Sequence, residues 1–389
     1  MDFDRLYLDY NATSPLSSSV LDWLKSGDLL FANPASQHSA GKASRKSINE
    51  TRAKIFQTFG KSENDSKLFF HSGATEGILT FAFSFAEQAR VEKKNLLICY
   101  SGLDHPAVTS LKERYFGHEV SFLELKLTQN LKYDHAFNLK TLQDRKQNDP
   151  TLIILYHHLW VHNETGIVSP LEALEDFKKI DDLFIHVDAV QSPGKISDWR
   201  ELSTADIFTF SAHKFGSLKG CGFSIFTKNL KFSPLISGGG QQSNLRSGTE
   251  NPQGTMSIAL ALKDLEKVDV ARVTKLRQRL DDYLSEALKG VGGVISERST
   301  LRNSNTVYFY LSDLSSDIAL ALFDLNGLMI SAGSACSSGA AKTSAIMNHL
   351  GFVKEAKNGL RISFSFDLSE SELEEIIKRL DVTFKKLKA

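Results

Sequence analysis

Two stretches of sequence decide the fold: FIHVDAVQ at residues 184–191 and IFTFSAHKFG at residues 207–216. Each begins with a short run of β-branched and aromatic residues, which is typical of a strand covered on both faces. Each run ends in polar side chains, as strands do where an open α/β sheet binds its ligands. The pair therefore predicts two successive strands of one sheet, with Asp188 and Lys214 at its carboxyl edge.

Similar apolar runs predict further strands at residues 68–70, 96–100, 120–125, 152–156 and 223–226. The segments between them leave room for crossover helices, so we expect an α/β fold. Its large domain would hold a mainly parallel, helix-flanked sheet.

After residue 255 the pattern changes to leucines at helical spacing and a strand-like run at 306–311. A small α+β domain is therefore expected beside the large one. We assign residues 15–255 to the large domain, and residues 1–14 together with 256–389 to the small domain.

Composition narrows the classes of function. The 389 residues are 41% hydrophobic and carry a formal net charge of zero, so no global field attracts nucleic acid or an acidic membrane. No apolar stretch approaches the roughly 20 residues that cross a bilayer. The first residues lack the basic and apolar segments of a signal peptide, so we expect a cytoplasmic protein that binds neither membrane nor nucleic acid directly.

The three cysteines are too few and too scattered for a disulfide framework or a zinc site, and we predict no metal centre. Cys99 and Cys221 lie in strand-like or glycine-flanked apolar contexts, which favours packing in the core. Cys336 lies in the loop at residues 331–345, SAGSACSSGAAKTSA, where small and polar residues dominate. Such a loop buries little apolar surface, so this cysteine is either incidental or a nucleophile delivered by motion.

Three clusters have two readings each when taken alone. SGATEG at 72–77, with Thr75 at the expected helix start, suits a phosphate or is an ordinary strand-to-helix turn. Asp188 could pair with a cation such as a protonated pyridine nitrogen, or cap a helix. Lys214 could form a Schiff base in a desolvated site, or be a solvated lysine.

Seven motifs in register resolve these alternatives. They are SGATEG, DHPAV, HNETG, HVDAVQ, SAHKFG, GGGQQSNLRSGT and GSACSSG. In this order they resemble the cysteine desulfurase branch of the fold-type-I pyridoxal-phosphate enzymes, which belongs to the class V aminotransferases. The opening YLDYNATSP and the segment NPASQH also match, so the resemblance runs from about residue 7 to about residue 366.

The resemblance implies pyridoxal 5'-phosphate as cofactor and a role for each matching residue. Lys214 would form the Schiff base and later transfer protons, Asp188 would pair with the pyridinium nitrogen, and Gln191 would bind the ring's phenolate oxygen. His105 would stack on the ring and act as acid or base. The phosphate would be held by Ala74, Thr75, Ser211 and His213, with Thr249 reaching it from the partner subunit of a homodimer. The substrate would be received by Asn163 and Arg361.

The implied reaction converts L-cysteine to L-alanine and leaves a persulfide on Cys336. An acceptor protein of iron–sulfur cluster assembly or tRNA thiolation would take the sulfur. Three alternatives stay open: a selenocysteine lyase or other class V aminotransferase-type enzyme, a non-catalytic binding protein on the same fold, and a nucleotide-binding α/β protein. The last lacks any G-x-x-x-x-G-K-[ST] or strand-linked G-x-G-x-x-G motif.

Overall fold

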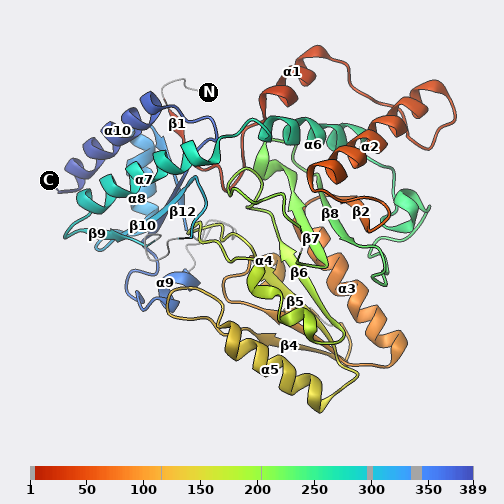
Figure 1. The fold of residues 1–389 in the computed structure, drawn as a ribbon. Coiled ribbons are helices and arrows are strands. Elements are labelled where there is room, and N and C mark those ends of the chain that lie inside the picture. Colours follow the sequence, from red (N-terminus) through yellow and green to blue (C-terminus); the bar gives the residue numbers. More distant parts are fainter. Residues whose placement is uncertain (1–4, 115, 203, 296–300, 334–343, 389) are drawn as a thin grey trace.

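A seven-stranded sheet forms the centre of the larger part of the molecule (Figure 1). The computed structural model describes residues 5–114, 116–202, 204–295, 301–333 and 344–388. In sheet order the strands are β2 (Ser66–His71), β8 (Gly222–Thr227), β7 (Ile207–Ser211), β6 (Leu183–Asp188), β5 (Ile153–Leu159), β3 (Leu96–Tyr100) and β4 (Val120–Glu124). Each of the seven apolar runs identified in the sequence lies within or overlaps one of these strands, which confirms the predicted α/β fold.

The sheet is mainly parallel, with one reversed strand. Strands β4, β3, β5, β6 and β7 pair in parallel, whereas β8 is antiparallel to both β7 and β2. Because β8 reverses direction between them, β2 points the same way as β7. The carboxyl end of β2 therefore returns to the edge at which the parallel strands end.

Helices cover both faces of this sheet. The helices are α1 (Ser18–Ser26), α2 (Ser39–Thr58), α3 (Ala74–Glu92), α4 (Pro106–Thr109), α5 (His135–Asn148) and α6 (Pro252–Leu265). Helix α3 packs on one face with Phe81 and Phe85 in a buried cluster that includes Phe69 and Ile153.

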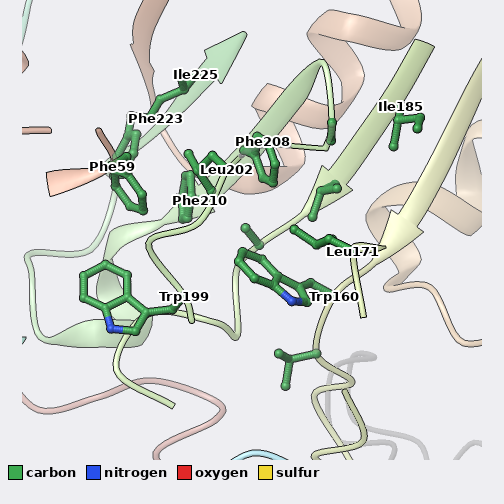
Figure 2. Close-up of a cluster of buried hydrophobic side chains, with 14 of the residues drawn as sticks. Phe59, Trp160, Leu171, Ile185, Trp199, Leu202, Phe208, Phe210, Phe223 and Ile225 are labelled. Atoms are coloured by element: carbon green, nitrogen blue, oxygen red, sulfur yellow. The ribbon is translucent and has the colours of Figure 1, made fainter. Parts of the chain in front are cut away.

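The opposite face holds the largest hydrophobic core. Figure 2 shows its aromatic centre, where Phe59 lies near Trp199, Phe210 and Phe223. The Phe59 ring is 5.6 Å from that of Trp199 in an edge-on arrangement, and Phe210 stacks on Phe223 at 4.7 Å. Aromatic pairs of this kind add to the free energy of area burial, so this core fixes β7 and β8 against the helices that cover them.

A second, smaller sheet lies beside the first, with both described chain ends nearby (Figure 1). Its order is β12 (Ser331–Ala332), β13 (Gly359–Ser363), β10 (Thr306–Leu311) and β9 (Gly292–Val294), and β1 (Leu6–Tyr7) pairs separately with β11 (Leu328–Met329). The accompanying helices are α7 (Val270–Ala287), α8 (Ser316–Leu325), α9 (Ala345–His349) and α10 (Glu370–Lys388).

The last helix of the chain begins with a capping box. The Ser369 hydroxyl accepts from the Glu372 backbone N–H at 3.2 Å, and the Glu372 carboxylate accepts from the Ser369 backbone N–H at 2.7 Å. This reciprocal pair satisfies donors at the start of α10.

The hydrophobic cores bear on the domain division. Ile258, Leu262 and Leu265 of α6 belong to the core of the large sheet, whereas Val273 and Leu280 of α7 belong to the core of the small one. We propose that the large domain extends through α6, later than the predicted boundary at residue 255.

Among the described residues, no helix is both long and apolar enough to cross a bilayer.

A matched pair of leucines, one buried and one exposed, tests the packing of the hydrophobic core of the small sheet. Leu280 is 0% exposed and Leu325, at the end of α8, is 80% exposed. Leu280→Ala should lower the free energy of unfolding by about 2–5 kcal/mol, because it removes buried methyl groups and leaves a cavity. Leu325→Ala should change it by less than about 0.5 kcal/mol. Urea denaturation followed by circular dichroism measures both, and equal effects would contradict the packing.

Candidate active site

The carboxyl ends of three strands meet at one edge of the large sheet. Asp188 ends β6 and Ser211 ends the parallel neighbour β7. His71 ends β2, and both His71 and Ser211 are paired with Gly222 at the start of β8. The loops that follow these strands carry the predicted phosphate-binding and lysine residues, and they therefore converge on one place.

A cavity of about 460 Å³ lies at this edge, a volume suited to a small-molecule cofactor. It brings together most of the residues that the sequence predicts for the site. The cavity is lined by Ala74, Thr75, His105, Asn163, Asp188, Gln191, Ser211, His213 and Lys214. Thr249 and Arg361 do not line it, and Cys336 lies outside the described residues.

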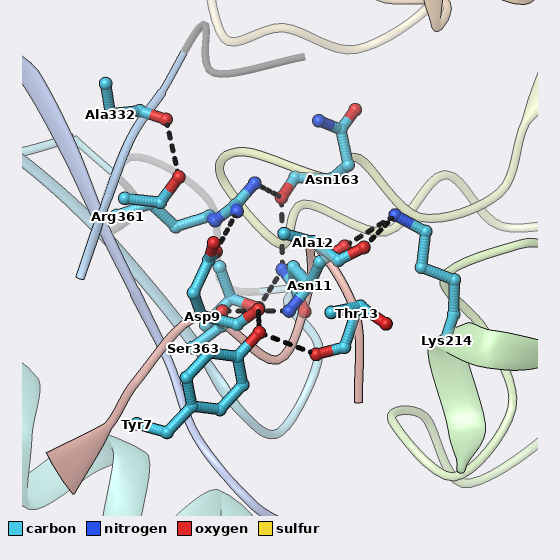
Figure 3. A network of polar contacts seen from close by, with 12 residues as sticks. Tyr7, Asp9, Asn11, Ala12, Thr13, Asn163, Lys214, Ala332, Arg361 and Ser363 are labelled. Carbon is cyan, nitrogen blue, oxygen red and sulfur yellow. Dashed lines mark hydrogen bonds and ion pairs between the residues drawn. The ribbon is translucent and has the colours of Figure 1, made fainter. Parts of the chain in front are cut away.

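Lys214 lies in the 3₁₀ turn η4 (Ala212–Phe215) directly after β7. Gly216 ends the turn with a φ of 96°, a left-handed conformation that favours glycine. The half-buried lysine donates hydrogen bonds to the backbone oxygen of Asn11 at 2.8 Å and to that of Ala12 at 2.9 Å (Figure 3). Two neutral backbone carbonyls thus hold the amine at the cavity wall.

Asp188 is a buried carboxylate, 8% exposed, facing the same cavity. Its Oδ1 accepts a hydrogen bond from the Val190 N–H at 3.0 Å. Burial raises the pKa of Asp188 to about 6, although the Val190 hydrogen bond and the charge of Lys214 oppose the shift. A cationic group placed in the cavity would stabilise the ionised form further.

His105 begins α4, and its Nδ1 accepts a hydrogen bond from the Ala107 N–H at 3.1 Å. The residue therefore caps α4 and also lines the cavity. Burial, followed by the charge of Lys214, lowers the pKa of His105 to about 4. A neutral ring whose Nδ1 accepts carries its proton on Nε2, so His105 is an uncharged donor at neutral pH.

The start of α3 provides a cradle of backbone donors. The Ser72 N–H is bound by the Glu76 carboxylate at 2.8 Å. Within the described chain, no acceptor is recorded for the N–H groups of Gly73, Ala74 and Thr75. Free N–H groups at the amino end of a long helix bind anions, because the helix dipole acts with them. With the nearby Ser211 and His213 side chains, this donor set fits a phosphate.

Asn11 is a site residue that the sequence reasoning left unassigned. It is 1% exposed, and its backbone and side-chain polar groups are all hydrogen-bonded. Its partners are the amines of Lys214 and Lys195, the amide of Gln191, the carbonyl of Asn163, and the hydroxyls of Thr306 and Ser363. The motif YLDYNATSP pointed to this segment, but a motif match does not identify the distant groups that it contacts.

Arg361, on β13, lies behind the cavity rather than in its wall. Its guanidinium forms an ion pair with Asp9, and its NH1 group donates to the Asn163 backbone oxygen at 3.1 Å (Figure 3). The side chain is 1% exposed, and among the described residues its Nε has no partner. Arg361 is thus close to the predicted substrate residue Asn163, but a carboxylate of this same chain already occupies it.

Thr249 is exposed and lines a separate cavity of about 100 Å³. The segment before it is fastened to the start of the phosphate cradle. The Gln242 amide exchanges two hydrogen bonds with the backbone of Phe70, at 2.6 and 2.9 Å, and Arg246 pairs with Glu76 at 2.9 Å.

Tyr308 packs against the chain on both sides of the segment that contains Cys336. Its hydroxyl donates to the Ser344 hydroxyl at 3.3 Å. A Cβ atom on Gly333 or Gly359 would collide with the same tyrosine ring or hydroxyl. The glycines at these two positions therefore make room for Tyr308.

The other two cysteines are buried, as predicted. Burial raises the pKa of the Cys99 thiol far above its usual value, and it also raises that of Cys221. Neither thiol is therefore ionised at neutral pH, so neither is a candidate nucleophile.

Asp104 is an enclosed carboxyl next to His105. Its Oδ2 accepts from the Ser101 N–H at 2.7 Å, while its Oδ1 has no partner among the described residues. Burial raises the pKa of Asp104 to about 8, and the charge of Asp188 acts in the same direction. The side chain is therefore protonated at neutral pH.

Replacing Asp104 by asparagine should change the pH dependence of stability. The unfolded carboxyl loses its proton near pH 3.8 and the folded one near pH 8, so the native chain becomes less stable as pH rises between these values. The variant has no such proton. The free energy of unfolding of the variant minus that of the native protein should therefore increase by up to about 1.4 kcal/mol for each pH unit in this window. Urea denaturation at several pH values measures the difference, and a constant difference would refute the assignment.

Comparison with known proteins agrees with this geometry. A sequence profile of the aminotransferase class-V family matches residues 6–376. The chain is 30% identical to the cysteine desulfurase IscS of Dictyoglomus turgidum, over 99% of this chain and 95% of that protein. It superposes on the structure of a NifS-like protein with a TM-score of 0.83 and 26% identity, covering 98% of this chain and 99% of the other.

A further solved structure, SspA in complex with cysteine, matches with a TM-score of 0.72 and 25% identity, over 92% of this chain and 98% of that one. Each of these matches covers at least 92% of this chain, and the family profile spans both sheets and the segments that line the cavity. The profile match and these near-complete alignments lead to one conclusion: this chain belongs to the aminotransferase class-V family.

Proposed function

We propose that this protein is a pyridoxal-phosphate-dependent cysteine desulfurase that converts L-cysteine to L-alanine. The observation that carries the proposal is the cavity itself, in which a lysine amine, a buried carboxylate and a cradle of free N–H groups face one another. A cofactor with an aldehyde, a basic ring nitrogen and a phosphate has one group for each of them. The family membership and the names of the relatives support the same activity.

The cofactor residues have distinct tasks in this proposal. Lys214 binds the aldehyde covalently, and Ala74, Thr75, Ser211 and His213 hold the phosphate. Asp188 pairs with the ring nitrogen and keeps it protonated, because the charge pair stabilises a carboxylate that burial alone disfavours. Gln191 donates to the ring's phenolate oxygen, and His105 stacks on the ring as a neutral imidazole.

When bound, the cofactor supplies an electron sink for the electron pair left at the substrate's Cα. The Lys214 amine, held by the carbonyls of Asn11 and Ala12 at the cavity wall, would carry the α-proton of the substrate. His105 can donate a proton through Nε2, since its Nδ1 is occupied by the Ala107 N–H.

Asn163 and Arg361 receive the substrate carboxylate. Arginine suits this task because its planar fork binds a carboxylate through two hydrogen bonds. The Asp9 carboxylate already pairs with Arg361, so the substrate carboxylate must share the guanidinium or displace Asp9. The Nε of Arg361, which has no partner among the described residues, is a donor available for sharing.

Cys336 takes the sulfur. Its thiolate attacks the sulfur of the bound substrate, so that an S–S bond forms as the C–S bond breaks and the C–S electron pair moves to Cβ. Protons from Lys214 and His105 complete alanine, and the products are L-alanine and a persulfide on Cys336. The thiols of the substrate and of Cys336 become one persulfide, and the C–S bond of the substrate becomes a C–H bond. The reaction therefore needs no external oxidant.

Substitution of the lysine and the cysteine separates cofactor binding from sulfur transfer. Lys214→Ala should form no covalent imine with added pyridoxal phosphate, as measured by borohydride trapping and mass spectrometry. Cys336→Ser should keep the imine and its visible absorption, but lose L-alanine formation by at least about 100-fold, as expected when a nucleophile is removed. A Cys336→Ser protein with full turnover would refute the nucleophile. Faster turnover of L-selenocysteine by that variant or by the native protein would favour a selenocysteine lyase.

We propose further that the protein is a homodimer in which Thr249 reaches the phosphate of the partner subunit. Thr249 is exposed and does not line its own chain's cofactor cavity, although it lines a smaller adjoining cavity that shares Ser72 and Gly220 with it. Exposed apolar residues lie on segments bonded to the region around Thr249. Phe31, 87% exposed, adjoins Leu30, which is bound by Gln253, and Ile236 accepts from the Ser247 N–H at 2.9 Å. A second copy that covers these side chains would bury apolar surface.

Mixed dimers test the exchange of Thr249. A dimer of one Lys214→Ala chain and one Thr249→Val chain contains one site with both Lys214 and Thr249 intact only if Thr249 acts in the partner. Such dimers should therefore hold one cofactor with native affinity, whereas neither homodimer should. If Thr249 serves its own subunit, the mixed dimer will contain no native site, and the absorbance titration will show none.

The persulfide would pass to an acceptor protein of iron–sulfur cluster assembly or tRNA thiolation. The zero net charge favours a protein acceptor over direct binding of tRNA. The cytoplasmic location stays a prediction from the sequence.

A further inference from the structure

Lys195 is a buried lysine without an ion-pair partner among the described residues. It is 1% exposed, and among the described residues no carboxylate lies within ion-pair distance of its amine. The amine instead donates to two amide oxygens, Asn11 Oδ1 at 3.0 Å and Gln191 Oε1. Burying an amine is costly unless hydrogen bonds or an opposite charge compensate for the lost hydration.

Two hydrogen bonds, one at each end of its amide, fix the orientation of the Gln191 side chain. A glutamine amide has an acceptor oxygen on one side and a donor nitrogen on the other, and its shape alone hardly distinguishes them. The Lys195 amine donates to the oxygen of Gln191, so the oxygen end of the amide faces this lysine. The nitrogen then lies on the opposite side, where it donates to the Asn11 backbone oxygen at 2.9 Å. Gln191 itself lines the cofactor cavity.

Asn11 links this arrangement to the catalytic lysine. Its side-chain oxygen binds Lys195, and its backbone oxygen binds both Gln191 and Lys214. Lys195, Gln191, Asn11 and Lys214 therefore form one connected hydrogen-bond network. Among the described residues, Lys195 is the only partner of the Gln191 side-chain oxygen.

We infer that Lys195 is a positioning residue that presents the nitrogen of Gln191, rather than its oxygen, to the cofactor. The inference rests on the proposed function, in which Gln191 donates to the ring's phenolate oxygen. Without Lys195 the amide is free to turn, and its oxygen then faces an anionic oxygen of the ring. The loss is one hydrogen bond to a charged group, replaced by repulsion.

A double-mutant cycle tests whether Lys195 acts through Gln191. Lys195→Met keeps the length of the side chain and removes the donor. It should weaken cofactor binding by about 10- to 100-fold, the range for one hydrogen bond to a charged group, and shift the visible absorption maximum. In the Gln191→Ala background the same substitution should change the dissociation constant by less than about 2-fold, because partners in one network are not additive.

The controls separate this effect from a general loss of structure. Lys228 is an exposed lysine that donates to the Glu63 backbone oxygen at 2.8 Å, so Lys228→Met removes a comparable bond far from the cavity and should leave the titration unchanged. Thermal unfolding of the cofactor-free proteins reports folding separately. Independent, multiplying effects of the two substitutions overturn the inference, as does a Lys195→Met protein with native affinity and native spectrum. A native protein that binds no cofactor overturns the proposed function, and the inference with it.

Discussion

The site depends on a polar contact between the N-terminal arm and the two sheets. Asn11 bonds to Ser363 and Thr306 of the small sheet and to Lys214 and Gln191 of the large one. The arm continues along the lysine turn, where the Ser14 hydroxyl donates to the Lys214 backbone oxygen at 2.8 Å. Because a buried amide is costly unless each of its groups is paired, Asn11 holds these partners in one fixed relation. The position of the reactive amine thereby depends on Asn11, which precedes Lys214 by about 200 positions and Ser363 by about 350 positions in the chain.

Histidines beneath the cavity contribute polarity without charge. A hydrogen-bonded chain crosses four strands, from His186 to Thr209 at 2.8 Å, on to Ser224 at 2.9 Å and to His71 at 3.0 Å. Burial lowers the pKa of His71 to about 4 and that of His186 well below its usual value. These rings are therefore neutral, so they add no positive charge that would compete for Asp188. Helix α3 approaches them at Gly77, where a side chain would collide with this chain of polar groups.

The sequence predicts what is local and misses what is distant. The strands follow from their apolar runs, and Asp188 and Lys214 follow from their places after two such runs, because a strand and the turn after it are neighbours in the chain. The reversed β8 was not foreseen, since its apolar run has the same composition as that of a parallel strand. The Asp9–Arg361 pair and the roles of Asn11 and Lys195 could not be predicted either, because each joins segments that only the folded topology brings together. Buried lysines and asparagines carry no pattern that distinguishes them from exposed ones.

Tyr308 has a consequence for how this chain can change over generations. Its ring takes the space that side chains at positions 333 and 359 would need, and its hydroxyl bonds to Ser344. An alanine at either glycine position becomes tolerable only after the tyrosine has been exchanged for a smaller residue, and that exchange removes the bond to Ser344. Among descendants of this sequence, positions 308, 333 and 359 are therefore expected to vary together or not at all.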